Sequence, residues 1–245
     1  MAPPIPPTVF AGRVTRVKHE THDTITVSVR AEDGREFKFK PGQWYSLFST
    51  RPDGAWDEGR PYSISSSPTT PDHLDFTIKL KPGGGFTPKA FKMKEGDKVG
   101  LNGPFGLFVF DPEKHAQCVF VAAGVGVTPM MSMIRFATDH KLENKITLLY
   151  TNKTKGDIIY HHELVDLEKR NPHFKMVSTL TRCPPEEEWG GCRGRIDAPF
   201  LHEHLGSFEG KFFFICGGTE FALDMSKFLK GLGVPTTHVK HEGFG

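Results

Sequence analysis

The chain has 245 residues, of which 37% are hydrophobic and 24% are charged, a composition typical of a globular protein long enough for two domains. The formal net charge is only +2, so overall charge gives no indication of nucleic-acid binding. No segment approaches the roughly 18 consecutive apolar residues of a membrane-spanning helix. The start, "MAPPIPPTVF", lacks the features of a secretory signal and predicts a short extended tail. We therefore expect a cytoplasmic protein with reduced thiols.

Up to about Asp111 the sequence predicts short β-strands. Segments such as "RVTRVKHE", "TITVSVR", "QWYSLFS", "RPYSISS" and "LDFTIKL" alternate apolar and polar residues, or are rich in β-branched and aromatic types. Turn-forming segments such as "KPGQ", "RPDG" and "KPGGG" separate them. Short strands at this spacing favour an antiparallel sandwich or barrel.

After Asp111 the pattern changes to apolar strands that alternate with helices. Strands are expected at "CVFVAAG", "KITLLYT", "FKMVSTL" and "KFFFICGG", with helical periodicity between them. This alternation is typical of a parallel sheet covered by helices on both faces. We therefore expect two domains: an antiparallel β-barrel over residues 1–111 and an α/β parallel-sheet domain over residues 112–245.

The segment "VFVAAGVGVTPMMSMI" predicts a nucleotide-binding turn between a strand and a helix. Gly124 and Gly126 would let the backbone approach a ligand closely, and free amides at a helix start favour a diphosphate. Thr128 is a candidate N-cap, and Pro129 suits the first helical turn. A turn that needs glycine for steric reasons alone is the alternative, since proline replaces the usual third glycine.

Other candidate residues come where the remaining parallel strands are expected to end. Ligands of open parallel sheets lie beyond the carboxyl ends of the strands. The residues expected there are Asn152, Lys153, Arg182, Cys216 and Gly217. Lys153 and Arg182 could bind phosphate or ribose groups, or they could be ordinary surface charges.

The stretch "RPYSISSSP" carries the candidate binding residues of the first half. An arginine suits a phosphate, a tyrosine ring can stack on a flat ligand, and a serine hydroxyl can donate to a ring nitrogen. Because alternate residues of a strand share a face, Arg60 and Tyr62 are expected on one side. Pro61 and Ser63 are expected on the other. A half-buried strand without a ligand is the alternative.

A second glycine-rich turn, "GGGFTP", follows in the same half. Gly84 and Gly85 precede Phe86 and Thr87, and Thr87 is a candidate N-cap before a proline. This exposed helix start is a second place for a diphosphate, with a flexible glycine hairpin as the alternative. One turn of this kind in each half indicates two nucleotide cofactors.

Together these motifs resemble the ferredoxin–NADP⁺ reductase superfamily, in particular its bacterial oxygenase-reductase-like branch, over nearly the whole chain. The resemblance rests on Arg60-x-Tyr62-Ser63, Gly84 to Thr87, "GPFGLF", "GVGVTP", the "CGG" that begins at Cys216 and the terminal "HEGFG". It implies an FAD-binding barrel followed by an NAD(P)-binding domain. It also implies that Arg60 binds the flavin phosphate, that Tyr62 and Ser63 meet the flavin ring, and that hydride passes from nicotinamide to flavin. The residues it places at the reacting centre are Ser63, Cys216, Glu242 and Phe244.

The implied activity is that of an NAD(P)H-dependent flavoprotein reductase with FAD as cofactor. The Cys-x4-Cys-x2-Cys spacing of a fused iron–sulfur domain is absent, so a separate electron-acceptor protein is expected, with ferredoxin or flavodoxin as first candidates. A flavin reductase that releases its flavin, and a flavin-binding electron-transfer subunit of a larger complex, are the alternatives. The choice between NADH and NADPH stays open.

No metal site is expected. Neighbours at i,i+1 or i,i+2 do not share a helix face, so His161-His162 and the pair His202 and His204 are interpreted as solvated helix surface. The four cysteines, Cys118, Cys183, Cys192 and Cys216, are scattered. Their spacing leaves a Cys183–Cys192 disulfide open.

Overall fold

The computed structural model describes residue 6 and residues 8–244. It contains two compact units. Unit 1 contains the chain up to Val109 together with Met131–Phe136, and unit 2 contains Phe110–Met130 together with Ala137–Gly245. The extended tail expected at the N-terminus falls mostly on residues 1–5 and 7, outside the described residues. Within the described part of the chain, no helix is both long and apolar enough to cross a membrane.

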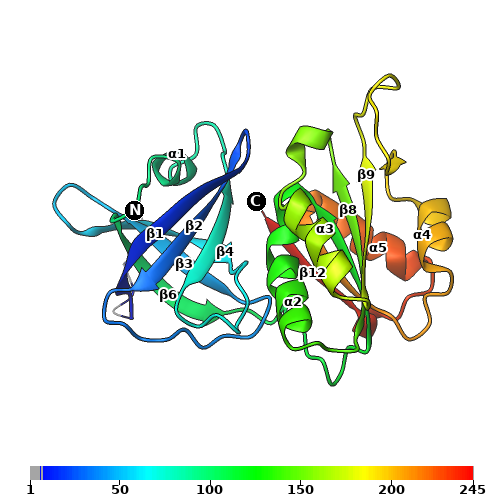
Figure 1. Ribbon diagram of the computed structural model, residues 1–245, viewed down its shortest axis with the longest axis horizontal. Coiled ribbons are helices and arrows are strands. Elements are labelled where there is room, and N and C mark those ends of the chain that lie inside the picture. The colour runs from blue at the N-terminus through cyan, green and yellow to red at the C-terminus, as the bar shows by residue number, and fades with distance from the viewer. Residues whose placement is uncertain (1–5, 7, 245) are drawn as a thin grey trace. The chain divides into compact units, whose positions relative to one another are not determined.

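Unit 1, drawn in Figure 1, is built on an antiparallel sheet. Its strand order is β4-β3-β6-β1-β2-β5. The bounds are β1 (Phe10–Thr21), β2 (Thr24–Ala31), β3 (Trp44–Thr50), β4 (Trp56–Ser63), β5 (Leu74–Lys79), β6 (Lys98–Phe105) and the short helix α1 (Thr87–Ala90). The alternating segments of the sequence form these strands because their apolar residues share one face of the sheet. Ile25, Leu47, Phe76 and Leu101 are fully buried in its core.

One backbone contact closes this sheet. The strands β4 and β5 lie at its two edges, and an isolated antiparallel bridge joins Ile64, directly after β4, to Phe76 in β5. Joining the two edge strands turns the sheet into a barrel and leaves no long open edge. The predicted antiparallel barrel is thereby confirmed, and the stretch from Arg60 to Ser63 lies beside the seam.

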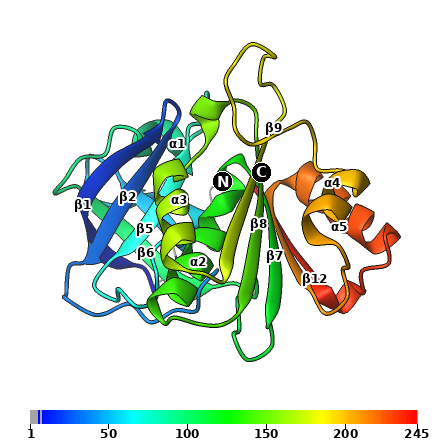
Figure 2. The ribbon, with the colours of Figure 1, turned by 45° about the vertical axis from the view of Figure 1, so that its right-hand side comes forward.

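Unit 2 is a parallel sheet with the strand order β10-β9-β8-β7-β11-β12. Figure 2 shows α3 on one face of the sheet and α4 and α5 on the other. The strands are β7 (Gln117–Ala123), β8 (Lys145–Asn152), β9 (Phe174–Leu180), β10 (Cys192–Arg193), β11 (Phe212–Gly218) and β12 (Val239–Phe244). The helices are η1 (Gly124–Val127), α2 (Thr128–Asp139), η2 (Lys155–Asp157), α3 (His161–Arg170), α4 (Ala198–Leu205), α5 (Thr219–Gly231) and η3 (Thr236–His238).

The order of the strands positions the second site. The chain runs from β7 outward through β8 and β9, then returns to the other side of β7 with β11 and β12. The order reverses at β7, and ligands of open α/β sheets bind beyond the carboxyl end of the strand at such a point. The turn that leaves this end of β7 is η1, the "GVGV" of the sequence motif.

Candidate nucleotide-binding sites

Arg60 lies near the end of β4 with a partly exposed side chain. Its guanidinium forms an ion pair with Glu58, and Nη1 donates to the carbonyl of Gly59 at 3.1 Å. The hydrogen bond with Glu58 raises the pKa of Arg60 and lowers that of Glu58, so both groups stay charged. A guanidinium has five donors, and those not used by Glu58 and Gly59 remain for a phosphate. The sequence interpretation missed Glu58, although i,i+2 residues share a strand face.

Tyr62 and Phe86 bring the two sequence motifs of unit 1 together. Their ring centroids are 5.4 Å apart with planes inclined by 39°. Tyr62 packs against the barrel core, and burial raises the pKa of its hydroxyl, so the phenol stays neutral. Pro61, between Arg60 and Tyr62, is exposed.

Ser63 is the residue of this strand that most clearly needs a partner. Its side chain is 4% exposed, and its hydroxyl has no hydrogen-bond partner among the described residues. A buried polar group left unpaired costs about 1–3 kcal/mol, so such groups are normally satisfied by protein, water or ligand. The unpaired hydroxyl beside Tyr62 therefore fits a flat ligand that carries a hydrogen-bonding ring atom, as a flavin does.

The glycine turn before α1 differs from the prediction. Thr87 is the first residue of α1 rather than its N-cap, and Phe86 occupies the cap position without a side-chain hydrogen bond. The Thr87 hydroxyl accepts a hydrogen bond from the amide of Lys81 at 2.9 Å and donates to its carbonyl at 3.2 Å. The capping prediction is wrong because this hydroxyl closes the loop that contains Gly84 and Gly85. Around Gly85 the space where a Cβ would lie is open.

In unit 2, Gly124 forms the open part of the turn after β7. Its φ is +52°, a conformation that favours glycine, and no atom lies within 4 Å of the place a Cβ would take. The buried hydroxyl of Tyr150 donates to the Gly124 carbonyl at 3.1 Å and supports the turn from β8. Tyr150 was missed from the sequence, although a tyrosine within the apolar strand "KITLLYT" signals a buried hydroxyl that needs a partner.

Thr128 does not cap α2 as predicted. The helix η1 runs directly into α2, and Thr128 has the helical angles φ −55° and ψ −56°. Its hydroxyl donates to the carbonyl of Val125 at 2.6 Å. The capping prediction is wrong because a cap residue needs non-helical angles and a free acceptor oxygen. Pro129, the second residue of α2, is buried in the first turn as expected.

Gly126 packs closely against the backbone of β11. A Cβ at this position would lie 2.1 Å from the carbonyl oxygen of Cys216 and 2.6 Å from the amide nitrogen of Gly217. These are backbone atoms of β11 that cannot move aside. The close approach that requires glycine at position 126 is therefore the packing of η1 on β11, while Gly124 presents its open side.

The ends of β8 and β9 lie side by side. The amide of Thr181 donates to the carbonyl of Asn152 at 2.9 Å, and that of Arg182 donates to the carbonyl of Lys153 at 2.8 Å. Asn152 is buried, whereas Lys153 and Arg182 are exposed and form no ion pair within the described ranges. Two neighbouring cations without a counter-ion form a local positive charge that suits an anion.

The ends of β11 and β12 bring together three of the four residues expected at the reacting centre, Cys216, Glu242 and Phe244, whereas Ser63 belongs to unit 1. Cys216 is paired in register with Glu242, Gly217 with Gly243 and Gly218 with Phe244. Burial, followed by the nearby Glu242 carboxylate, raises the pKa of the Cys216 thiol well above its usual range. Burial raises the pKa of Glu242 to about 7. The thiol is therefore neutral at physiological pH, and the carboxyl is partly protonated.

The structure also resolves the cysteine and histidine patterns. All four thiols are free, so the disulfide left open between Cys183 and Cys192 is not formed. His202 is exposed, as expected for helix surface. His204 departs from that interpretation because it is half-buried, with Nε2 lying 3.4 Å from the Sγ of Cys192.

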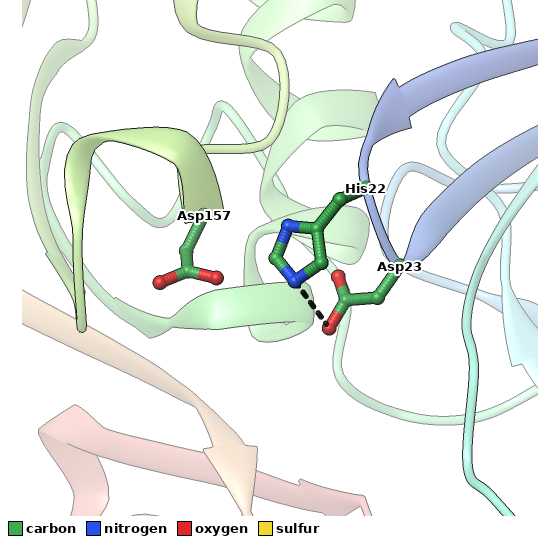
Figure 3. Close-up of side chains that lie close together, drawn as sticks. All are labelled: His22, Asp23 and Asp157. Atoms are coloured by element: carbon green, nitrogen blue, oxygen red, sulfur yellow. Dashed lines mark ion pairs between the residues drawn. The ribbon is translucent and has the colours of Figure 1, made fainter.

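The carboxylates of Asp23 and Asp157 are each engaged by residues of their own unit. Figure 3 shows His22 and Asp23 in the turn between β1 and β2, where His22 Nε2 lies 3.7 Å from a carboxylate oxygen of Asp23. Although burial alone would raise the pKa of Asp23, hydrogen bonds led by that from Lys79 hold it below its usual value. Asp157, also drawn, belongs to unit 2, where it accepts hydrogen bonds from the amide and hydroxyl of Thr154.

Comparison with known proteins assigns each unit to a domain type. The model of the oxidoreductase FAD-binding domain matches residues 11–110, and that of the oxidoreductase NAD-binding domain matches residues 120–227. Fold and sites therefore define an FAD- and NAD-binding oxidoreductase. Ferredoxin–NADP reductase B of Sorangium cellulosum is 32% identical over 241 residues, which cover 96% of this chain and 97% of that protein. The chain belongs to the ferredoxin–NADP reductase family, and the resemblance inferred from the sequence is confirmed.

Other relatives extend the comparison. The glycine betaine monooxygenase reductase subunit of Pseudomonas aeruginosa is 32% identical over 234 residues, or 95% of this chain, which spans only 63% of that protein's length. Among solved structures, a ferredoxin NADP⁺ reductase from Neisseria gonorrhoeae with bound FAD and NADP matches with a TM-score of 0.80 and 22% identity, over 97% of this chain and 99% of that one. The FAD/NAD-binding domain of a Vibrio cholerae nitric oxide dioxygenase gives 0.84 and 21%, over 96% and 98%. At these identities the likeness concerns the fold.

Proposed function

We propose that the protein is a flavin-dependent NAD(P)H reductase that transfers electrons from NAD(P)H through bound FAD to a separate protein. The chemistry that bound FAD supplies is acceptance of a hydride and release of the electrons one or two at a time. The observation that carries the proposal is the unpaired, buried Ser63 hydroxyl beside Tyr62 in an FAD-binding domain. A flat ring with a hydrogen-bonding atom satisfies that hydroxyl.

In unit 1 the proposed roles follow from the chemistry of each side chain. Arg60 binds a flavin phosphate through the donors that Glu58 leaves open, and Tyr62 packs on the ring with Pro61 beside it. Ser63 hydrogen-bonds the reactive edge of the ring. The loop from Gly84 to Thr87, with the open Cβ space at Gly85, holds the second phosphate of a dinucleotide flavin. A complete second phosphate loop favours tightly bound FAD over a released flavin.

In unit 2 the proposed roles centre on the turn after β7. The open backbone at Gly124 and the first turn of α2, with Thr128 and Pro129, receive the diphosphate of NAD(P)H. Gly126, Cys216 and Gly217 form the packed floor of that turn. Glu242 and Phe244 line the nicotinamide side as positioning residues. Asn152 at the end of β8 faces the ribose.

We further propose that NADPH is preferred over NADH. Lys153 and Arg182 are joined through their backbones and have no counter-ion in the described chain. These residues lie at the carboxyl ends of β8 and β9, the second and third strands of unit 2. The adenosine ribose of a dinucleotide lies at this end of such a sheet. A 2′-phosphate there would accept charge-assisted hydrogen bonds from both side chains. NADH lacks that group and gains nothing from the two cations.

The electron acceptor is proposed to be a small redox protein. Two curated relatives are a glycine betaine monooxygenase reductase subunit and the reductase component of a propane 2-monooxygenase, names that describe parts of multicomponent systems. Ferredoxin and flavodoxin are the first candidates for this chain.

The first experiment is a visible spectrum of the purified protein, with the released cofactor identified by chromatography. We expect a yellow protein that releases FAD and is bleached by NADPH under anaerobic conditions. Reoxidation by added ferredoxin or flavodoxin then measures electron transfer to a protein. A colourless protein without affinity for flavin would refute the proposal, and FMN alone would refute the role of the second phosphate loop.

Coenzyme preference is tested with Lys153→Ala and Arg182→Ala. Loss of one charge-assisted hydrogen bond, about 1.5–3 kcal/mol, should weaken NADPH binding by roughly 10- to 100-fold while leaving NADH binding nearly unchanged. Lys175→Ala is the matched control, because Lys175 is an exposed lysine near the start of β9, away from its carboxyl end. Equal effects on the two coenzymes would refute a 2′-phosphate site.

A further inference from the structure

A thiol and an imidazole meet at the edge of unit 2, outside both proposed nucleotide sites. The Sγ of Cys192, in the edge strand β10, lies 3.4 Å from Nε2 of His204 in the last turn of α4. The imidazole is oriented by an edge-to-face contact with Phe200, whose ring centroid is 4.4 Å away. Asp197 caps α4 by accepting a hydrogen bond from the amide of Phe200 at 2.9 Å. Both partners are therefore held by regular structure.

This pair distinguishes Cys192 from the other thiols. Cys118 and Cys216 are 2% and 0% exposed, and burial raises the pKa of both. Neither is accessible to a small molecule in solution. Cys192 is partly exposed, and its pKa is raised by burial and then by the Glu203 carboxylate, so its resting form is the thiol. Its reaction therefore requires a base within reach to take the thiol proton, and Nε2 of His204 lies 3.4 Å from the sulfur.

The other partly exposed thiol belongs to the same loop. Cys183 and Cys192 flank residues 184–191, and the guanidinium of Arg193 holds the loop together. Arg193 donates to the carbonyls of Cys183 at 3.3 Å, Pro184 at 2.8 Å and Glu187 at 2.6 Å. Cys183 itself points its thiol at the Glu187 carboxylate, 3.6 Å away.

We propose that Cys192 is a peroxide-reactive thiol, with His204 as its base and Cys183 as the thiol that resolves the oxidised form into a disulfide. In the first step His204 takes the thiol proton as sulfur attacks a hydroperoxide. The S–O bond forms, the O–O bond breaks, and the proton passes to the leaving oxygen, so that sulfur is oxidised by two electrons and the peroxide is reduced. In the second step the Cys183 sulfur displaces that oxygen as water, forming the S–S bond.

The disulfide requires a movement of the loop. Bonded cysteines have Cα atoms about 4.4–6.8 Å apart, and the contacts of Arg193 with the carbonyls of Cys183 and Pro184 hold the loop in its reduced form. Oxidation should therefore exchange the Cys183–Glu187 contact for a covalent bond.

One consequence rests on the proposed function. Arg182 directly precedes Cys183, so a loop drawn toward Cys192 would carry Arg182 away from the Lys153 carbonyl that now holds its amide. The oxidised protein should then bind NADPH more weakly than the reduced protein. The thiol chemistry itself does not depend on nucleotide binding and is tested separately.

The test treats the full chain with hydrogen peroxide, in the presence or absence of dimedone, and maps all four cysteine peptides by mass spectrometry under non-reducing conditions. We expect a Cys183–Cys192 disulfide in the wild type. In Cys183→Ser we expect a dimedone adduct on Cys192, because the resolving thiol is gone. Cys118 and Cys216 serve as internal controls that stay unmodified in the folded protein. Oxidation of Cys192 no faster than of those two thiols would overturn the proposal.

The role of the base is tested with His204→Gln against His202→Gln, a change of the exposed histidine on the same helix. His204→Gln should slow oxidation of Cys192 by about 100-fold or more, the lower end of what a general base contributes, and His202→Gln should not. Equal rates in both variants would refute His204 as the base. Weaker NADPH binding after oxidation supports the link to Arg182. An intact disulfide with unchanged NADPH binding removes that link and leaves the thiol site standing.

Discussion

Cys216 and Glu242 lie opposite each other in the parallel pairing of β11 and β12, one register step before Gly217 and Gly243. The same Cys216 carbonyl would lie 2.1 Å from a Cβ at position 126, so β11 also forms the floor of the turn after β7. A buried thiol and a half-buried carboxyl thus share one end of the sheet with that turn. Their surroundings disfavour the charged form of both groups.

The carboxyl of Glu242 should make stability depend on pH. Its folded pKa of about 7 lies above the ordinary value of 4.5, so the folded state binds the proton more tightly than the unfolded state does. Stability is therefore lost as pH rises from about 4.5 to about 7. Glu242→Gln should remove this loss. In thermal unfolding, the Tm of the variant should rise relative to that of the wild type across this pH range. The expected difference is about 2–4 °C for each 1 kcal/mol of stability that the wild type loses. Glu209→Gln, at an exposed site, is the control, and a difference independent of pH would contradict the assignment.

Substitutions at Arg60 and Glu58 should change the affinity for flavin in opposite directions. Arg60→Ala should weaken flavin binding by about 10- to 100-fold with the fold retained, because it removes a charge-assisted contact to phosphate from a partly exposed site. Glu58→Gln should strengthen binding, since the carboxylate competes with the phosphate for the guanidinium. Flavin fluorescence titration of the apoprotein measures both. Arg30→Ala, in another exposed ion pair of the barrel, is the control. Binding unchanged in Arg60→Ala would make the residue structural.

The two glycines of the turn after β7 should respond differently to substitution. Gly126→Val would force side-chain atoms into the backbone of β11 and should destabilise unit 2 by several kcal/mol or prevent its folding. Gly124→Ala costs about 1–2 kcal/mol of backbone strain and leaves the packing intact. It should keep flavin bound and weaken NAD(P)H binding, because a methyl group then covers the open backbone. Calorimetry measures the loss of stability, and anaerobic titration measures the affinity for NAD(P)H. A Gly126→Val protein as stable as the wild type would refute the packing argument.

Phe244 should influence the reaction with the nicotinamide nucleotide. It is the last residue of β12, paired with Gly218, and an aromatic ring can cover one flat group and yield to another at little rotamer cost. Deleting Phe244 and Gly245 should change the rate or apparent affinity of reduction in stopped-flow experiments with NADPH and NADH. Leu223→Ala, at an exposed hydrophobic residue of α5, is the control for loss of apolar surface. Identical kinetics in truncated and full-length protein would leave Phe244 without a role there.

Much of the fold was accessible from the sequence because its strands keep their periodicity. The apolar segments that form β7, β8, β9 and β11 were identified within a residue or two. The strand β6 was missed, since Gly100, Gly103 and Pro104 interrupt its pattern and glycine and proline are poor strand residues. The strand β10 has only two residues, too short for any periodicity.

For the candidate sites, the sequence indicated which residues take part but not how those residues contact one another. Threonine before proline correctly indicated a helix start at Thr87 and Thr128, yet both hydroxyls bind carbonyls that local sequence cannot identify. The opposition of Gly126 and Cys216 depends on strand order and register, which join residues far apart in the chain. The contact between Cys192 and His204 likewise depends on how α4 packs beside β10. Contacts of this kind follow from tertiary structure, which periodicity does not encode.

The closure of the barrel by the single bridge between Ile64 and Phe76 has a dynamic consequence. Every other neighbouring pair of strands in this sheet shares a ladder of at least four paired residues, so the seam is where the ring should open at the lowest free energy. Such opening is local unfolding. It exposes the strand from Arg60 to Ser63, while the core that contains Ile25 and Leu101 stays packed. Amide protons along the seam should then exchange with solvent before those of β1 and β2. A cofactor bound beside the seam would stabilise the contact between Ile64 and Phe76. Slower exchange of these amide protons would then show that the cofactor is bound.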